Sequence, residues 1–342
     1  TGVFYNNTQL TKVSLPSTLT IICGEAFYNC RSLESIDIPD SVTSIGGYAF
    51  YYCLGLQSVE IPESVTEISQ SAFYACKGLE KVILHEGLKA IESSAFEACE
   101  KLVKINFPST LESIGGYAFR KTGFTSITIP ASVTSFGARV FAECPNLTDA
   151  TFEDGVTVIA KEMFYKCSAL KNVYIPNTIT QVKANAFDSC SALENVYLNG
   201  TLEDWLKITF DINNAKSQPL YYAENLYFNN ELVTEVVIPE TVTIINTYAF
   251  YNYDKLTSVK IPSTVNRINK SAFAACSNLT DLTIEEGVKT FGSFVFSDCD
   301  ALTSVTIPAS ITSIGNNVFE ECDALTKVVF AEGSTTTGVK TF

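Results

Sequence analysis

A pattern of 23 residues recurs along almost the whole chain and limits the folds that the chain can adopt. Most repeats start 23 residues after the previous one, but one start comes a residue early and one follows a gap of 40 residues. Self-similarity at a fixed period of this length is the signature of repeat architectures. The repeats begin at Leu10, Leu33, Leu56, Leu79, Leu102, Phe124, Leu147, Leu170, Leu193, Val233, Leu256, Leu279, Leu302 and Leu325.

Each position within a repeat has a characteristic residue type. Counting the first residue as offset 0, offsets 3 and 5 are apolar and alternate with polar residues, as Val305 and Ile307 do. This alternation predicts a short strand with one buried face. Offset 6 is usually Pro, which lacks a backbone N–H for the ladder and therefore ends the strand. Aliphatic residues at offsets 9 and 12 predict a second short extended or 3₁₀ segment, and the run A-F-x-x-C at offsets 16 to 20 turns the chain back.

The repeats predict a single elongated solenoid domain of about 14 repeats over residues 1–342. One repeat cannot bury its apolar residues alone, whereas stacked repeats share a continuous core. The chain begins and ends inside a repeat, so we expect either a longer chain or atypical end caps. Ser334 and Thr337 stand at the normally apolar offsets 9 and 12, so we expect the last repeat to be frayed.

The cysteines follow the repeat rather than a metal or redox motif. Ten of the eleven stand at offset 20, Cys23 stands at offset 13, and the sequence contains no C-x-x-C. Cys is small and often buried, so we predict a column of free buried thiols. Distance alone does not exclude disulfides between neighbouring repeats. The ten are Cys30, Cys53, Cys76, Cys99, Cys144, Cys167, Cys190, Cys276, Cys299 and Cys322.

Charge and composition argue against several classes of function. The formal net charge of −14 makes the chain a poor partner for nucleic acid or anionic lipid. No run reaches the roughly 18 apolar residues of a membrane span. His85, the only histidine, replaces Pro at a corner, which indicates a surface residue and disfavours Ser-His-Asp or Cys-His catalysis. We therefore predict no enzyme activity, no catalytic residue and no cofactor.

Several corners contain an acidic residue followed by Gly, as in Glu86-Gly87. Glycine at offset 8 predicts a positive φ there. One or two carboxylates fall short of the six to eight oxygen ligands that calcium prefers. We therefore expect solvated corners and no metal site.

The largest irregularity is the 40-residue stretch 193–232, which holds 17 residues more than a regular repeat. The pattern can be traced through Leu198, Leu202, Trp205, Phe210 and Asn213 at offsets 5, 9, 12, 17 and 20, which places an insertion at residues 214–232. Within it, residues 226–232 predict a β-hairpin with an Asn-Asn turn. Long loops in compact domains are often functional.

Polar and aromatic residues near this insertion form the candidate partner-binding surface. Offsets 2 and 4 point outward from the predicted sheet and are small or charged in most repeats, but two adjacent repeats carry Asn and Tyr there. Such residues combine hydrogen bonding with flat apolar area and suit protein or glycan recognition. The alternative is that Trp205 and the aromatics of the insertion cover the irregular repeat. The candidate residues are Asn172, Tyr174, Asn195, Tyr197, Tyr221, Tyr222 and Tyr227.

The full pattern, L-x-x-[IV]-x-I-P-x-[ST]-[VIL]-T-x-I-G-x-x-A-F-x-x-C, resembles the BspA-like, treponemal-type bacterial leucine-rich repeat family. Residues 33–53 are close to its consensus, and the resemblance covers essentially the whole chain. It implies a curved, right-handed leucine-rich repeat solenoid with a parallel β-sheet, on secreted or cell-surface proteins that are often linked to adhesion or host-protein binding. It implies no catalytic residues.

We therefore expect a non-enzymatic extracellular or cell-surface module that binds a protein partner, such as a host extracellular protein, or a glycan. A structural spacer that carries another domain is the alternative, and a glycan-active enzyme ranks third. No signal peptide is visible, and the chain opens on Thr rather than Met, so this absence says little about the compartment.

Overall fold

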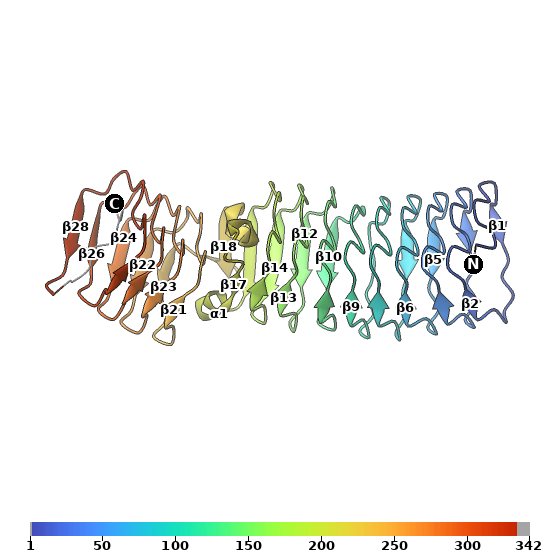
Figure 1. The fold of residues 1–342 in the computed structure, drawn as a ribbon, viewed down its shortest axis with the longest axis horizontal. Coiled ribbons are helices and arrows are strands. Elements are labelled where there is room, and N and C mark those ends of the chain that lie inside the picture. The colour runs from blue at the N-terminus through green and yellow to red at the C-terminus, as the bar shows by residue number, and fades with distance from the viewer. Residues whose placement is uncertain (1, 334–342) are drawn as a thin grey trace. The chain divides into compact units, whose positions relative to one another are not determined.

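The computed structural model describes residues 2–333, which form a parallel β-solenoid of about 14 turns with one short α-helix (Figure 1). The stacked architecture predicted from the 23-residue period is confirmed. The expectation of a frayed last repeat concerns Ser334 and Thr337, which lie outside the described residues. The described chain divides into an N-terminal unit, residues 2–171 with 185–192, and a C-terminal unit, residues 172–184 with 193–333. The assignment of one domain over 1–342 stays a prediction.

In the N-terminal unit, most turns contribute a strand within offsets 2 to 5 and a two-residue strand at offsets 11 and 12, and the turn that starts at Leu102 has only an isolated bridge from Lys104 to Lys81 in the first position. Strands of one kind pair in parallel with a register of one repeat, as in Val59 with Val82 and Ile45 with Ile68. The first kind comprises β1 (Lys12–Val13), β3 (Ser35–Ile36), β5 (Ser58–Glu60), β7 (Lys81–Ile83), β10 (Ser126–Ile129) and β12 (Asp149–Phe152). The second comprises β2 (Ile21–Ile22), β4 (Ser44–Ile45), β6 (Glu67–Ile68), β8 (Ala90–Ile91), β9 (Ser113–Ile114), β11 (Ser135–Phe136) and β13 (Val158–Ile159).

The C-terminal unit repeats this arrangement. Its first series comprises β14 (Asn172–Pro176), β16 (Asn195–Asn199), β18 (Asn225–Phe228), β20 (Glu235–Val237), β22 (Ser258–Ile261), β24 (Asp281–Ile284), β26 (Ser304–Ile307) and β28 (Lys327–Phe330). Its second comprises β15 (Gln181–Val182), β17 (Thr209–Phe210), β21 (Ile244–Ile245), β23 (Arg267–Ile268), β25 (Thr290–Phe291) and β27 (Ser313–Ile314). The remaining elements are α1 (Leu202–Lys207), β19 (Glu231–Leu232) and the 3₁₀ turns η1 (Ala215–Ser217) and η2 (Pro219–Tyr221).

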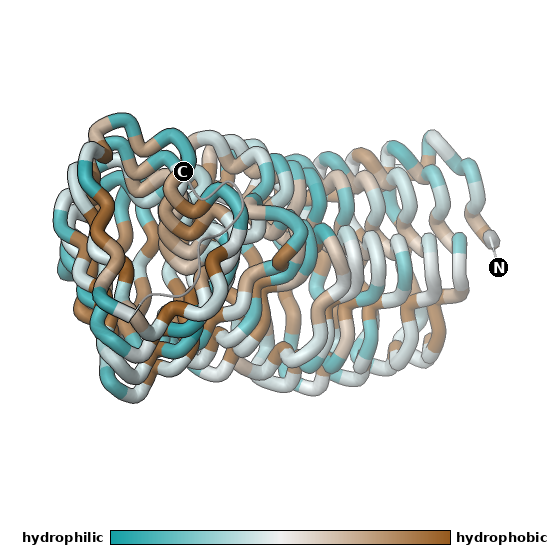
Figure 2. Tube along the Cα trace, turned by 60° about the vertical axis from the view of Figure 1, so that its left-hand side comes forward, coloured by the Kyte–Doolittle hydropathy of each residue, from teal (hydrophilic) through white to brown (hydrophobic). Residues whose placement is uncertain are grey.

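A column of phenylalanines at offset 17 forms the centre of the core in each unit. Phe27, Phe50, Phe73 and Phe96 are fully buried, and neighbouring rings stack with centroids 5.1 to 5.3 Å apart. Hydrophobic and hydrophilic residues alternate around each turn, and the same alternation returns from turn to turn (Figure 2). Each turn is therefore stabilised mainly by the turns on either side of it.

The cysteine column is a set of hydrogen-bond donors, nine of them buried and one, Cys322, half-buried. All eleven cysteines are free, which confirms the prediction of unpaired thiols. Each of the ten at offset 20 donates its Sγ–H to the carbonyl oxygen of the Phe at offset 17 in the preceding turn, as Cys76 does to Phe50 at 3.1 Å. A small apolar side chain that can also donate one weak hydrogen bond fits this position, which explains the recurrence of Cys.

The corner at offsets 14 to 20 has an unusual backbone. In each regular turn, two non-glycine residues at offsets 15 and 19 adopt left-handed conformations, such as Tyr48 at φ 59° and Tyr52 at φ 60°. Both backbone N–H groups donate to the next turn, Tyr48 to Gln70 at 3.1 Å and Tyr52 to Tyr74 at 2.9 Å. These bonds offset the cost of the left-handed conformation, which is roughly 1 to 2 kcal/mol per residue. The predicted positive φ at offset 8 is confirmed, for example 104° at Gly87.

The structure corrects the trace of the irregular stretch. Phe210 pairs with Val182, so Phe210 stands at offset 12, and its assignment to offset 17 was wrong. The extra residues before it form α1, which begins with a capping box between Thr201 and Asp204. Residues at offsets 9 and 12 are three apart, as are neighbours on one face of a helix. Leu202 and Trp205 are three residues apart because they lie on one face of α1, and this spacing is the same as that of offsets 9 and 12 in a regular repeat.

A second correction concerns the insertion at residues 214–232. Leu226 pairs in parallel with Val196, so β18 takes the strand position of a further turn that starts at residue 223. That turn ends after its strand, because Asn229 and Asn230, both at positive φ, reverse the chain into β19. The 17 extra residues are therefore split between a lengthened turn at 193–222 and a truncated turn at 223–232.

Candidate functional site

Three tyrosines form a stacked row on the outer face of β14, β16 and β18. The ring centroids of Tyr174 and Tyr197 lie 4.8 Å apart with an interplanar angle of 8°, and those of Tyr197 and Tyr227 lie 4.7 Å apart at 13°. The spacing equals the separation of neighbouring strands in a sheet. Tyr174 has 37% of its surface exposed, and the other two rings are half-buried.

An asparagine row runs beside the tyrosine row. The side-chain amide of Asn195 donates to the carbonyl oxygen of Asn172 at 2.9 Å, and that of Asn225 donates to Asn195 at 3.0 Å. Amides joined in this way are fixed in orientation, so each row presents the same groups at a constant spacing. We call the six residues the sheet patch: Asn172, Tyr174, Asn195, Tyr197, Asn225 and Tyr227.

Strand alternation explains why these side chains point outward. The residues between them, Val173, Val196 and Leu226, are fully buried and hold the three strands on the core. Parallel pairing in register then brings Asn opposite Asn and Tyr opposite Tyr. Asn225 was missed by the sequence analysis, although the third occurrence of an Asn-x-Tyr triplet, at residues 225–227, was a signal for it.

Tyr221 and Tyr222 are not part of these rows. Their ring centroids lie 4.8 Å apart in an edge-to-face arrangement. Tyr221 also stacks on Tyr251, a corner residue of the repeat that starts at Val233, with the ring centroids 6.0 Å apart. The amide of Asn252 donates to the carbonyl oxygen of Tyr221 at 3.3 Å. The structure therefore brings together five of the seven predicted residues and places these two elsewhere.

Trp205 covers the irregular turn. Its side chain is fully buried, and its indole N–H donates to the carbonyl oxygen of Ala249 at 2.9 Å. Gln218 is also fully buried and donates to the same carbonyl at 3.3 Å. For Trp205 the structure supports the alternative of a packing role over a role in the exposed surface.

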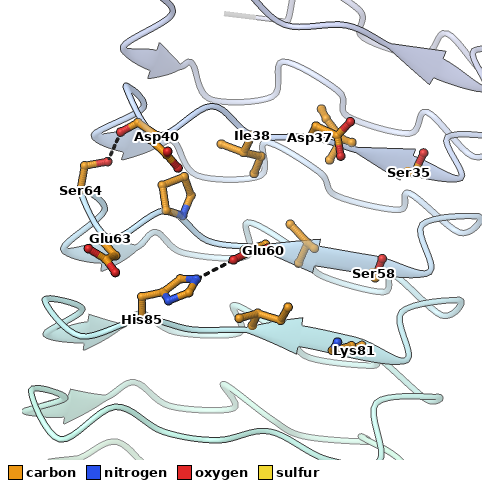
Figure 3. Close-up of a pocket in the computed structure, with 14 residues that line it drawn as sticks. Ser35, Asp37, Ile38, Asp40, Ser58, Glu60, Glu63, Ser64, Lys81 and His85 are labelled. Atoms are coloured by element: carbon orange, nitrogen blue, oxygen red, sulfur yellow. Dashed lines mark hydrogen bonds and ion pairs between the residues drawn. The ribbon is translucent and has the colours of Figure 1, made fainter. Parts of the chain in front are cut away.

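A shallow groove of about 900 Å³ lies on the N-terminal unit, and acidic residues predominate among its charged side chains (Figure 3). His85 lies at this groove with its Nε2 2.7 Å from an oxygen of Glu60 on the neighbouring turn. Asp37, Asp40 and Glu63 also line it. The predicted place of His85, at a surface corner, is confirmed, since about a third of its side chain is exposed.

The acidic corners hold the backbone of the next turn. The carboxylate of Glu86 accepts hydrogen bonds from the backbone N–H groups of Ser109 and Thr110 and from the hydroxyl of Ser109. These bonds lower the pKa of Glu86. Within residues 2–333 no cluster of three or more His, Cys, Asp or Glu is arranged to hold a metal ion. No helix in this range is long and apolar enough to cross a membrane.

The model of the BspA-type leucine-rich repeat region matches residues 1–123, 89–216 and 223–342. A search of the curated proteins found no match. Among solved structures, a leucine-rich repeat protein from Bacteroides ovatus shares 26% identity with a TM-score of 0.61, and the match covers 89% of this chain and 82% of that one.

Two further structures are similar over shorter or less closely superposed regions. A leucine-rich cell surface protein from Faecalibacterium prausnitzii is 24% identical, with a TM-score of 0.37 and coverage of 92% and 83%. The T. pallidum leucine-rich repeat protein is 28% identical, with a TM-score of 0.45 and coverage of 51% and 82%. The repeat pattern, the stacked turns and the family model agree, and the chain belongs to the BspA-type leucine-rich repeat family.

Proposed function

We propose that this chain is a non-enzymatic recognition module of the bacterial surface, which binds a protein partner through the sheet patch. The family and fold are typical of repeat scaffolds for protein interaction. The surface location is part of the proposal and rests on the family, whose resemblance links it to secreted and cell-surface proteins. The observation that carries the proposal is the paired Tyr and Asn rows across β14, β16 and β18.

The sheet patch has the chemistry of an interface centre. Tyrosine supplies a large, rigid contact area and a hydroxyl at low cost in conformational entropy. The asparagines fix each other through one donor and one acceptor, and a primary amide has two N–H donors and two acceptor sites in total. At the same outward position, β22, β24 and β26 carry Lys260, Thr283 and Thr306, which are small or charged and all exposed. A partner that excludes water from the aromatic row would gain most of its affinity there.

The test begins with a screen of the soluble chain against extracellular-matrix proteins and glycans. For a protein that binds, the double variant Tyr174→Ala and Tyr197→Ala should raise the dissociation constant about 30-fold or more, because interface anchors cost about 2 kcal/mol or more when truncated. The matched control is Thr283→Ala with Thr306→Ala, which alters the same outward position on β24 and β26.

Circular dichroism spectra and thermal unfolding of both double variants establish that the fold is intact. Unchanged binding of the folded tyrosine variant would rule out the sheet patch as the interface. A screen in which neither proteins nor glycans bind would favour the spacer function instead.

A further inference from the structure

Four tyrosines at offset 18 form a second aromatic row, on the corner of the N-terminal unit. Tyr5, Tyr28, Tyr51 and Tyr74 come from successive turns, and we call them the tyrosine column. Neighbouring ring centroids lie 4.6, 4.7 and 4.7 Å apart, with interplanar angles of 8°, 10° and 11°. The column lies at the A-F-x-x-C corner and not on the sheet, so it is a different surface from the sheet patch.

Two more tyrosines widen the column at one turn. Tyr48 and Tyr52 flank Tyr51, with centroids 5.6 and 4.9 Å from its ring and planes tilted by 52° and 44°. Both have the left-handed backbone of the corner, which fixes the direction of their side chains. Tyr48 is 36% exposed and Tyr5 is 46% exposed. The six rings together form one aromatic surface at this corner.

The stacking decides what the column presents to a partner. Each ring covers the face of its neighbour, so the column offers ring edges and hydroxyl groups. Partial burial and neighbouring tyrosines raise the pKa of Tyr51 to about 12. Burial also raises the pKa of Tyr28 and of Tyr74. The hydroxyls are therefore protonated donors at neutral pH, spaced at a constant interval along a line.

We propose that the tyrosine column binds a proline-rich, basic protein segment in the polyproline II conformation, which lies along the column. Such a helix has three residues per turn and a rise of 3.1 Å, so it presents the same face roughly every 9.3 Å. Two steps of the column, of 4.6 and 4.7 Å, cover the same distance. Backbone carbonyls of polyproline II make no internal hydrogen bonds and are free to accept from the hydroxyls.

Other repeating chains fit this spacing less well. A β-strand presents one face roughly every 6.7 Å, and an α-helix rises about 5.4 Å per turn, so neither stays in step with the column. Sugars stack on the open faces of aromatic rings, and here the faces are covered by neighbouring rings. Aromatic-lined surfaces that recognise polyproline II exploit its preformed, low-entropy conformation.

The charge of the unit favours a basic partner. Residues 1–100 contain twelve Asp and Glu against five Lys and Arg. Glu25 is exposed and close enough to Tyr28 to contribute to its raised pKa. The nearby cations are Lys77 and Arg120, and both are already paired, Lys77 with Glu100 at 2.7 Å and Arg120 with Glu97 at 3.1 Å. A lysine or arginine within the proline-rich segment would therefore meet net negative charge beside the column.

The first experiment uses the unaltered chain. A fluorescently labelled peptide of four Pro-Pro-Lys triplets is titrated with the protein, and binding is followed by fluorescence anisotropy. The control peptide of four Gly-Gly-Lys triplets has the same charge but is flexible. We expect the proline peptide to bind at least about tenfold more tightly, because its conformation is already ordered. Equal binding of the two peptides, or no binding of either, would overturn the proposal.

The second experiment removes hydroxyls and keeps the stack. The triple variant Tyr28→Phe, Tyr51→Phe and Tyr74→Phe should weaken binding of the proline peptide by about fivefold for each hydroxyl that a carbonyl uses. The matched control is Tyr165→Phe, at offset 18 of a later turn, where the ring contacts Arg139 and Lys166. Thermal unfolding checks that each variant is folded.

The two experiments distinguish this proposal from the proposed function of the sheet patch. Loss of binding in the triple variant, with the Tyr165→Phe control unchanged, supports the proposal. Unchanged binding in the triple variant would overturn it even if the proline peptide binds, since another surface would then be responsible. Loss of a glycan rather than the proline peptide in the same variant would also overturn it. The sheet-patch variants leave the tyrosine column intact, so either proposal can fail alone.

Discussion

Tyr253 should hold the truncated turn in place through its hydroxyl. It occupies the cysteine position of its repeat and is fully buried. Its hydroxyl accepts from the backbone N–H of Leu226 at 3.3 Å and donates to the carbonyl oxygen of Val233 at 2.5 Å. These two backbone groups bracket the hairpin of β18 and β19. The hydroxyl of Tyr253 therefore supplies hydrogen bonds to backbone groups that would otherwise pair with the strand of a complete turn.

The substitution Tyr253→Phe removes this bridge and keeps the ring. A buried donor or acceptor that loses its partner costs about 1 to 3 kcal/mol, and two groups are affected, so we expect local destabilisation of at least about 2 kcal/mol. The substitution Tyr253→Cys restores the residue of the other repeats. We expect it to destabilise more than Phe does, because it also leaves a cavity where the ring was.

Hydrogen exchange followed by mass spectrometry is the suitable assay, since repeat arrays need not unfold in one step. Peptides that cover residues 223–256 should exchange at least about 30-fold faster in Tyr253→Phe, because the exchange rate rises about tenfold for each 1.4 kcal/mol of lost local stability. The control is Tyr251→Phe, whose half-buried ring stacks on Tyr221. Exchange in Tyr253→Phe within about threefold of the wild type would refute this reasoning.

Three further predictions concern the core and the corners. Gly287→Ala should lower the free energy of unfolding, measured with denaturant, by at least about 2 kcal/mol more than Gly155→Ala does. A Cβ at Gly287 would lie 2.0 Å from a backbone carbonyl oxygen, whereas a Cβ at Gly155 would meet only a methyl group at 3.1 Å. Burial raises the pKa of Cys190 and of Cys276 to about 12 from 9.0. The neutral thiols therefore stabilise the fold fully below pH 9, and this stabilisation is lost as the pH rises toward 12. A melting temperature that does not fall between pH 9 and pH 12 would contradict this prediction. Trp205→Phe removes the indole N–H from its backbone carbonyl and should cost about 1 to 3 kcal/mol, detected as a lower melting temperature; an unchanged value would show that the hydrogen bond contributes nothing.

The sequence alone determined the repeat architecture and the positions of its core. In a solenoid each residue contacts its counterpart one repeat away, so a pattern with a fixed period specifies the tertiary contacts as well as the local structure. That is why the Phe and Cys columns, the strand at offsets 3 and 5 and the outward direction of Tyr174 and Tyr197 could be predicted. The hairpin turn at Asn229 and Asn230 was also readable, because Asn adopts positive φ readily.

The tertiary structure decided everything that departs from the period. Trp205 lies 44 residues from the carbonyl that its indole binds, and no periodic rule connects two such positions. The same holds for β18, whose parallel pairing with β16 extends both rows of the sheet patch by one strand. Local spacing was ambiguous here, because α1 places Leu202 and Trp205 three residues apart, as the repeat does.

The tyrosine column is periodic, yet its geometry could not be predicted from the sequence. Its four residues recur every 23 positions and could have been noticed, but the sequence does not show that non-glycine residues at offsets 15 and 19 take left-handed conformations. The backbone N–H groups of these residues donate hydrogen bonds to the next turn, so contacts between turns support the left-handed conformations. The sequence pattern therefore determined how the repeats stack, whereas contacts between turns determined which side chains form the exposed surfaces.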